Sequence, residues 1–378
     1  MKFITAFIAA LITALAVTIY SLPLGAAETG RAPAGGYELN DSHFHLTNYI
    51  QEGTDIHRFL EIMGDKVGRV ALFGIPLQQM WSYENSGEFA PTYYLQSDAP
   101  LYYYSFTDAW IAMAYKSLKP SEQARFDPMI TGFNPADMYA ADHIRRVLRT
   151  FPGVFSGIGE FTIHKEFVSA KVAGGEPSLA NRALDRIFDF AGESGLVVLI
   201  HNDIDVPFAK EGAMPVYLQQ MRDLLLRHPD TTVIWAHAGL GRVVHPVQSE
   251  ASAGIAERAA NQVGIIDRIL DEPKFRNLYF DISWNEVAKY IVATPESTQR
   301  AASVINRFPD RFLFGTDEVA PPDQATYLRV YRQYDPLWNL LTPEAKQKVL
   351  KGNYERLFDR ARVQVRAWEA ANLKAAGK

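Results

Sequence analysis

Short apolar runs rich in Val, Ile and Phe recur along the chain from residue 38, and most are followed by apolar residues at helical spacing. Continuous apolar runs are typical of parallel strands that are buried on both faces of a sheet. Eight such runs predict an α/β fold, a closed (β/α)8 barrel of the TIM type rather than an open sheet. The predicted strands are residues 37–45, 67–75, 127–133, 154–161, 195–201, 231–237, 277–283 and 311–317.

Some helices between these strands have readable ends. Residues 179–194 place apolar side chains on one helical face and stop before Gly195, the residue type that most often ends a helix. A Thr-Pro pair at 342–343 gives the cap and first turn that open a helix, and residues 353–365 form a further predicted helix. We therefore expect a barrel domain over residues 38–365 and a C-terminal tail over 366–378.

One segment departs from this rhythm. Residues 77–125 separate the second and third predicted strands by far more than a usual loop, and they contain nine Tyr and Trp residues. Loops that follow barrel strands lie at the carboxyl face, where active sites are built. We therefore predict a long Tyr-rich insertion after strand 2, which forms either a lid or aromatic wall over the site or a satellite core on the outside of the barrel.

The first 27 residues have the order of a secretory signal peptide: a short cationic start, an apolar run over residues 3–20, and a Pro-Gly break that ends in small residues. We expect cleavage after Ala27, a linker over residues 28–37, and a secreted or periplasmic protein without stable membrane association. The alternative is a retained anchor, because the apolar run is close to the ~17 residues that can span a bilayer. The absence of Cys excludes disulfides and lipid attachment through an N-terminal Cys.

The charge balance narrows the classes of partner. The formal net charge is -5, and no sustained run of Lys and Arg gives the footprint that nucleic-acid binding requires. We expect a small-molecule substrate and no nucleic acid, and a homo-oligomer stays open.

Polar residues follow the predicted strands at corresponding places. His43 and His45 are two residues apart, so in an extended strand both imidazoles point to the same face and can meet on one metal ion. Four other strand ends carry Glu160, His201, His237 and Asp317. Because the ends of different strands converge at the mouth of a barrel, the sequence predicts a metal site assembled from distant segments.

These residues lie in motifs that resemble the amidohydrolase superfamily, in the amidohydrolase-related branch that includes decarboxylases of the aminocarboxymuconate semialdehyde type. The resemblance spans residues 38 to about 360 and implies a distorted barrel with metal held by His43, His45, His201 and Asp317. The matching stretches are Asp41-Ser42-His43-Phe44-His45, Gly157-Ile158-Gly159-Glu160, Leu199-Ile200-His201, Trp235-Ala236-His237-Ala238-Gly239, Phe314-Gly315-Thr316-Asp317 and Gly352-Asn353-Tyr354-Glu355-Arg356-Leu357-Phe358.

The donor types fit Zn²⁺, with Mn²⁺, Fe²⁺ and Co²⁺ as alternatives, and an open position on such an ion holds a water whose pKa falls toward ~7. Asp317 can contact the metal and accept a proton from that water, which makes it the predicted general base. The resemblance implies that His237 polarises the substrate carbonyl or stabilises the oxyanion. Direct ligation by His237, as in two-metal relatives, is the alternative.

Glu160 is the main departure from the family pattern, because many two-metal relatives carry a carboxylated Lys on the fourth strand. A carboxylate can bridge two ions, which would make the site binuclear, or it can orient a ligand imidazole from outside. We therefore expect one ion, or two if Glu160 bridges. Around the mouth, Arg242 can grip a substrate carboxylate or pair with a loop acid, and Trp284 and His164 are candidate pocket walls.

The leading hypothesis is metal-dependent hydrolysis of a small ester, lactone or amide. The alternative is metal-dependent, non-oxidative decarboxylation of a small aromatic or unsaturated carboxylate on the same scaffold. A third hypothesis is a binding protein that has lost catalysis. The presence of both Asp317 and His237 argues against the third, because ligation alone would not require both.

Overall fold

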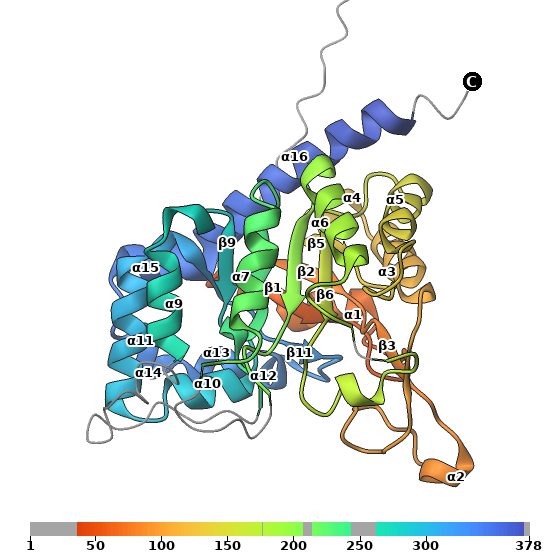
Figure 1. The fold of residues 1–378 in the computed structure, drawn as a ribbon, viewed down its shortest axis with the longest axis horizontal. Helices are drawn as coiled ribbons and strands as arrows, with labels where there is room; N and C mark the ends of the chain where they lie inside the picture. The colour runs from red at the N-terminus through yellow and green to blue at the C-terminus, as the bar shows by residue number, and fades with distance from the viewer. Residues whose placement is uncertain (1–35, 176, 207–213, 243–261, 374–378) are drawn as a thin grey trace, which may run out of the picture.

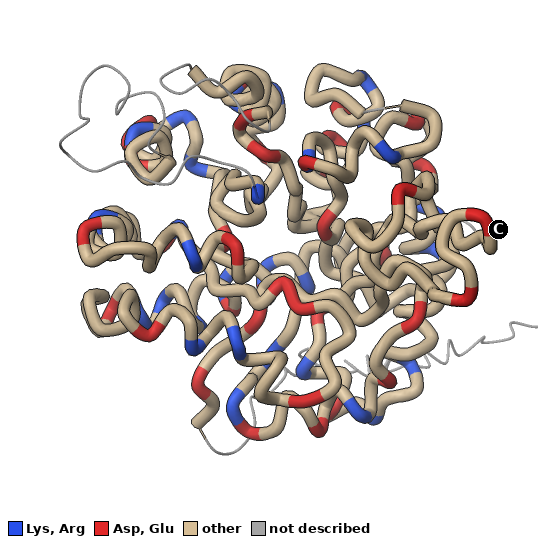
Figure 2. The backbone as a smooth tube through the Cα atoms, turned by 90° about the horizontal axis from the view of Figure 1, so that it is seen from below, with Lys and Arg blue, Asp and Glu red and all other residues tan. Residues whose placement is uncertain are grey.

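The computed structural model describes residues 36–175, 177–206, 214–242 and 262–373 (Figure 1). The predicted signal peptide, residues 1–27, and most of the predicted linker, 28–37, lie outside the described residues. Within the described ranges, no helix is both long and apolar enough to cross a membrane. Basic and acidic residues are interspersed along the described backbone rather than gathered in blocks (Figure 2).

Nine parallel strands form one sheet in the order β10-β9-β8-β7-β6-β5-β2-β1-β11. All eight predicted strands are present at their expected places, with the last one split in two. The prediction of an α/β barrel of the TIM type is therefore confirmed. The strands are β1 (Leu39–His45), β2 (Val67–Phe73), β5 (Phe126–Ile130), β6 (Gly157–Thr162), β7 (Val197–His201), β8 (Val233–Trp235), β9 (Leu278–Asp281), β10 (Phe312–Leu313) and β11 (Glu318–Val319).

The split strand joins the two edges of the sheet. β10 pairs with β9, and β11 pairs with β1. Between them, Ser42 N donates to Phe314 O at 3.0 Å and Asp317 N donates to His43 O at 2.8 Å. Gly315 is required at this crossing, because a Cβ there would lie 2.7 Å from the Cβ of His43. The sheet therefore closes beside the predicted site.

Helices cover the outside of the sheet and bury its apolar face in one large cluster. The side chain of Asn181 accepts from Ala183 N and so moves the start of α6 past the predicted 179, while Gly195 ends the helix in the left-handed conformation, as predicted. The helices are α1 (Ile56–Met63), α2 (Tyr83–Ser86), α3 (Phe106–Ser117), α4 (Pro120–Gln123), α5 (Ala140–Thr150), α6 (Arg182–Ser194), α7 (Leu218–Arg227), α9 (Gln262–Leu270), α10 (Asn285–Ile291), α11 (Pro295–Arg307), α12 (Gln324–Tyr327), α13 (Arg329–Gln333), α14 (Asp335–Trp338), α15 (Pro343–Gln347) and α16 (Asn353–Leu373), with short 3₁₀ or π turns η1 (Ser169–Lys171), η2 (Ala236–Gly239), η4 (Pro273–Phe275), η5 (Pro309–Arg311) and η6 (Lys348–Gly352).

Helix α16 is longer than the sequence predicts. It continues to Leu373, so most of the expected tail, residues 366–378, is helical (Figure 1). Val365 and Trp368 are three residues apart, share a helix face and are buried in the main core. The first half of α16 packs with inward-facing strand residues in a second apolar cluster. The helix therefore fills the amino end of the barrel.

The predicted insertion, residues 77–125, divides into two parts. Its second part holds α3, which contacts β2 and β5 and buries Ile111 and Ala112 in the main core, so this helix belongs to the barrel itself. The extra segment ends at residue 105 and contains β3 (Leu77–Gln79) paired antiparallel with β4 (Leu101–Tyr103). Aromatic residues on both parts concealed this boundary in the sequence. A satellite apolar cluster lies under the segment and includes Tyr94.

Candidate metal centre

Six polar side chains predicted from the strand ends meet at the carboxyl end of the barrel. Five of them are buried, and the sixth, Asp317, has a side chain that is 9% exposed and lines a cavity. They project from β1, β6, β7, the turn η2 after β8, and the segment between β10 and β11. The six residues are His43, His45, Glu160, His201, His237 and Asp317.

The potential ligand atoms form two groups that share Glu160. Within each group, all ligand atoms lie within 4.8 Å of one another. The set that the family resemblance implies does not form one group among the described residues, because His201 belongs to the second. The first group is Glu160 with His43, His45 and Asp317, and the second is Glu160 with His201 and His237.

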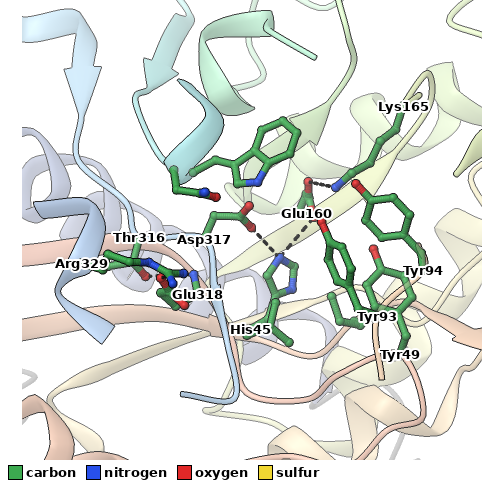
Figure 3. Close-up of a pocket in the computed structure, with 14 residues that line it drawn as sticks. His45, Tyr49, Tyr93, Tyr94, Glu160, Lys165, Thr316, Asp317, Glu318 and Arg329 are labelled. Carbon is green, nitrogen blue, oxygen red and sulfur yellow. Dashed lines mark hydrogen bonds and ion pairs between the residues drawn. The ribbon is translucent and has the colours of Figure 1, made fainter. Parts of the chain in front are cut away.

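The two carboxylate oxygens of Glu160 face different imidazoles. Oε2 lies 3.3 Å from His45 Nε2 and 3.9 Å from His43 Nε2. Oε1 lies 3.3 Å from His237 Nε2 and makes a short contact with His201 Nδ1. Strand β6 therefore places one carboxylate between two pairs of nitrogen donors (Figure 3).

Asp317 closes the first group from the opposite strand. Its Oδ1 lies 3.2 Å from Nε2 of both His43 and His45. The backbone φ of Asp317 is 55°, and φ is also positive at His237 and Trp284, which border the same site. Non-glycine residues in this conformation are strained and cluster at functional sites.

Hydrogen bonds fix the tautomers of three imidazoles. His43 Nδ1 lies 2.9 Å from Asp281 Oδ2, and His201 Nε2 lies 3.0 Å from Asp203 Oδ1. Because a carboxylate only accepts, these two nitrogens donate. Ser283 Oγ donates to Asp281 and therefore accepts from His237 Nδ1 at 2.8 Å. In the neutral imidazoles, the lone pairs that remain point toward Glu160 or Asp317.

The sequence analysis did not identify these orienting partners. Asp281 ends the seventh predicted strand, so the signal that marked the other strand ends was present there too. Its second oxygen accepts from His237 N at 2.7 Å, which explains why Asp281 also groups with His43 and His237. Asp203 lies two residues beyond His201, and no periodic pattern distinguishes it from a loop carboxylate.

The charges of the site favour a bound cation. Burial would raise the pKa of Glu160, but Lys165 and His201 hold it well below its ordinary value. Burial would likewise raise the pKa of Asp317, and His43 and His237 hold it well below the usual range. Burial lowers the pKa of His201 and of His237. At neutral pH the centre therefore presents ionised carboxylates and neutral imidazoles, the forms that bind metal.

His43 reports the same preference for positive charge. Burial lowers its pKa, but Asp281 and Asp317 outweigh this effect and raise the pKa well above the ordinary value. Its Nε2 atom is buried and has no hydrogen-bond partner.

A cavity of about 200 Å³ opens onto this centre (Figure 3). The predicted wall residue Trp284 lines it, with ring centroids 5.1 Å from His237 and 6.3 Å from His201. Lys165 also lines it, although the sequence analysis assigned it no role. The other lining residues are His45, Tyr49, Ile75, Tyr93, Tyr94, Glu160, Asn285, Thr316, Asp317, Glu318, Val319 and Arg329.

Two predicted substrate residues do not line this cavity. Arg242 donates to Tyr93 Oη at 2.6 Å and pairs with Glu286 at 3.0 Å, so the alternative of pairing with a loop acid describes it. His164 stacks on Tyr217 with ring centroids 3.6 Å apart. Both predictions rested on position alone, and the side chains turn to neighbouring loops.

A family model described as amidohydrolase matches residues 41–360. The chain belongs to the amidohydrolase family. This confirms the resemblance inferred from the motifs, and the chain is an enzyme of the amidohydrolase type that acts on a small molecule. No match was found among curated proteins.

Solved structures share the fold of this amidohydrolase at low sequence identity. A TIM-barrel protein from Bordetella bronchiseptica is 16% identical, with a TM-score of 0.50 over 86% of this chain and 99% of its own. A protein described as a 2-pyrone-4,6-dicarboxylic acid hydrolase from Pseudomonas putida is 12% identical, with a TM-score of 0.49 over 86% and 99%. A 2,6-dihydroxybenzoate decarboxylase is 13% identical, with a TM-score of 0.48 over 86% and 100%.

Proposed function

We propose that this amidohydrolase is a metal-dependent hydrolase of a small ester, lactone or amide, and that it holds two divalent ions bridged by Glu160. One observation carries the proposal: the oxygens of Glu160 face two separate pairs of imidazole nitrogens. A binuclear hydrolase uses such an arrangement to activate water and polarise a carbonyl at the same place.

The residues present fit such ions. The lone pairs of neutral His201 and His237 face a carboxylate oxygen, which is repulsive unless a cation lies between them. The buried Nε2 of His43 likewise lacks a hydrogen-bond partner. The donors are nitrogen and oxygen without sulfur, a set that suits Zn²⁺ and also accepts Mn²⁺, Fe²⁺ or Co²⁺.

The two groups suggest a division of ligands. His43, His45 and Asp317 would hold one ion, His201 and His237 would hold the other, and Glu160 would serve both. In this assignment His237 is a ligand, which was the alternative to its role as an oxyanion stabiliser. Its backbone N–H is fixed by Asp281, so the imidazole has little freedom to turn toward substrate.

When bound, the ions supply Lewis acidity and lower the pKa of water toward ~7. Asp317 is the residue placed to take the proton, because it lines the cavity and its lowered pKa keeps it ionised. Trp284 covers His237 and His201 and excludes bulk water from that side. Asp281 and Asp203 hold the imidazoles in the tautomers that ligation needs.

Metal analysis tests the binuclear centre. We expect about two equivalents of transition metal per chain after gentle purification, and loss of one equivalent or more in Glu160→Gln, which keeps the shape but not the charge. Less than half an equivalent in the wild-type protein would overturn the proposal. One equivalent in both proteins would leave Glu160 as an outer carboxylate and refute the bridge.

A substrate panel tests the reaction. Lactones, esters, N-acyl amino acids and aromatic carboxylates should be scored both for acid release and for CO₂. Acid release that disappears with chelation is the expected result. Release of CO₂ without hydrolysis would replace hydrolysis with the alternative of non-oxidative decarboxylation.

Export remains a proposal that rests on the sequence pattern of residues 1–27. N-terminal sequencing of protein collected outside the cytoplasm should begin near Glu28. Recovery of an intact Met1 in a membrane fraction would instead favour the retained anchor.

A further inference from the structure

Lys165 is a buried cation that the hydrolytic mechanism does not use. Its side chain is 7% exposed and lines the cavity, and Figure 3 shows its ammonium group beside Glu160. In the described part of the chain its one ion pair is with Glu160 Oε1, at 3.8 Å, which is beyond hydrogen-bond distance. The ammonium also lies 5.6 Å from the ring centroids of both Tyr94 and Trp284.

The charge of Lys165 needs a partner once Glu160 is shared with metal. In the proposed centre both oxygens of Glu160 serve ions, so an ammonium 3.8 Å away would face positive charge. An anionic group between the ions and Lys165 would relieve this repulsion and satisfy donors that have no hydrogen bond. The cavity is the space in which such a group would sit.

The other cations near the cavity are already paired. Arg329 donates to Glu318 at 2.8 Å. Arg242 pairs with Glu286 and donates to the hydroxyls of Tyr93 and Tyr94. Lys165 is thus the cavity cation without a hydrogen-bonded acid among the described residues.

The size and walls of the cavity limit what carries the anion. A cavity of ~150 Å³ is enough to bind benzene, so a volume of about 200 Å³ admits one six-membered ring with small substituents. The walls present flat side chains on several sides, and such faces favour a planar ring. These side chains are Tyr49, Tyr93, Tyr94 and Trp284.

We propose that Lys165 is a specificity-determining residue that binds a carboxylate of the substrate, so that the substrate class is a ring-sized ester, lactone or amide bearing a carboxylate. The inference rests on the proposed metal centre, because ions on Glu160 are what free Lys165 for substrate. It goes further in naming the charged group that the cavity selects.

Titration calorimetry with two probes of equal shape tests this inference. Benzoate carries the carboxylate, and benzamide is its neutral counterpart. Lys165→Met should weaken benzoate binding on the order of 10- to 100-fold, the value of one charge-assisted interaction, and leave benzamide binding unchanged. Lys165→Arg should keep most of the benzoate affinity. The matched control is Lys289→Met, which removes an exposed Lys paired with Glu286 and should bind both probes like the wild-type protein.

The outcomes separate the two proposals, since metal content is measured on the same samples. Benzoate binding that is equal in Lys165→Met and wild type, or undetectable in the metal-loaded wild type, overturns the role of Lys165. Low metal content overturns the proposed hydrolase centre, whatever the benzoate ratio. Unchanged benzamide binding shows that the variant is folded, and Lys165→Gln carries the same test if Lys165→Met does not fold.

Discussion

Two clusters of buried charge lie at opposite ends of this barrel, and they differ in how completely they are paired. At the amino end, Asp127 of β5 accepts from Arg69 at 2.8 Å, from Tyr354 at 2.7 Å and from Arg362 at 2.5 Å. At the carboxyl end, lone pairs face carboxylates and His43 Nε2 has no hydrogen-bond partner. A fully paired cluster stabilises a fold, whereas an incompletely paired one stores the capacity to bind.

The largest expected effect is on turnover, at the incompletely paired end. Asp317→Asn keeps the shape of the side chain and one oxygen but removes the base, so turnover should fall by about 1,000-fold or more while some metal is retained. Measurement of kcat beside metal content on a confirmed substrate checks this. Turnover within a few-fold of wild type would remove Asp317 from proton transfer.

The paired cluster should respond in stability instead. Asp127→Asn leaves Arg69 and Arg362 without their buried carboxylate and should lower the free energy of unfolding by about 3 kcal/mol or more. Metal content and turnover per folded molecule should not change. Denaturant unfolding gives the first quantity, and loss of metal in the folded variant would show that the two ends are not separable.

The same carboxylate gives a pH dependence whose sign can be stated. Burial would raise the pKa of Asp127, but Arg362 and Arg69 hold it below the ordinary value. Its contribution to stability is therefore complete above the unfolded pKa near ~4 and is lost as the pH falls through the lower folded pKa. Unfolding curves below pH 4 should be steeper in pH for the wild type than for Asp127→Asn.

An intermediate effect is expected where the two kinds of cluster meet. Asp203 is a paired acid that orients a ligand, since it accepts from His201 Nε2 at 3.0 Å. Asp203→Ala should weaken binding of the second ion by about 10- to 100-fold. Asp189→Ala is the matched control, because Asp189 pairs with His228 at 2.9 Å outside the site. Equal metal affinity in both variants would make the contact of Asp203 merely structural.

The barrel could be predicted from the sequence because every central strand is a continuous apolar run. What failed were boundaries that depend on packing between distant segments. Residues 366–373 were expected as a tail, but Trp368 is buried and its Nε1 donates to Glu193 at 3.0 Å. The helix α3 was assigned to the insertion because its aromatic residues obscure its place on β2 and β5.

The ligand-type residues could be predicted because they follow strands that end at one rim. Their grouping could not be, since it depends on which way each side chain turns within that rim. Glu160 divides the imidazoles into two sets only because His201 presents Nδ1 while Asp203 holds its Nε2. Asp281, Asp203 and Lys165 carry no motif of their own, and their roles come from atoms they contact across the barrel.

The smallest expected effect concerns Arg242, which tests whether full pairing also marks a structural role at the rim of the site. The guanidinium pairs with Glu286 and holds the hydroxyls of Tyr93 and Tyr94, so none of its charge is directed into the cavity. Arg242→Gln should raise KM by less than ~5-fold and leave kcat unchanged, because a partly exposed ion pair contributes at most ~1 kcal/mol. A loss of 100-fold or more, on substrates with a carboxylate alone, would assign to Arg242 the grip that the cavity gives to Lys165, and pairing would then no longer separate structural charge from functional charge.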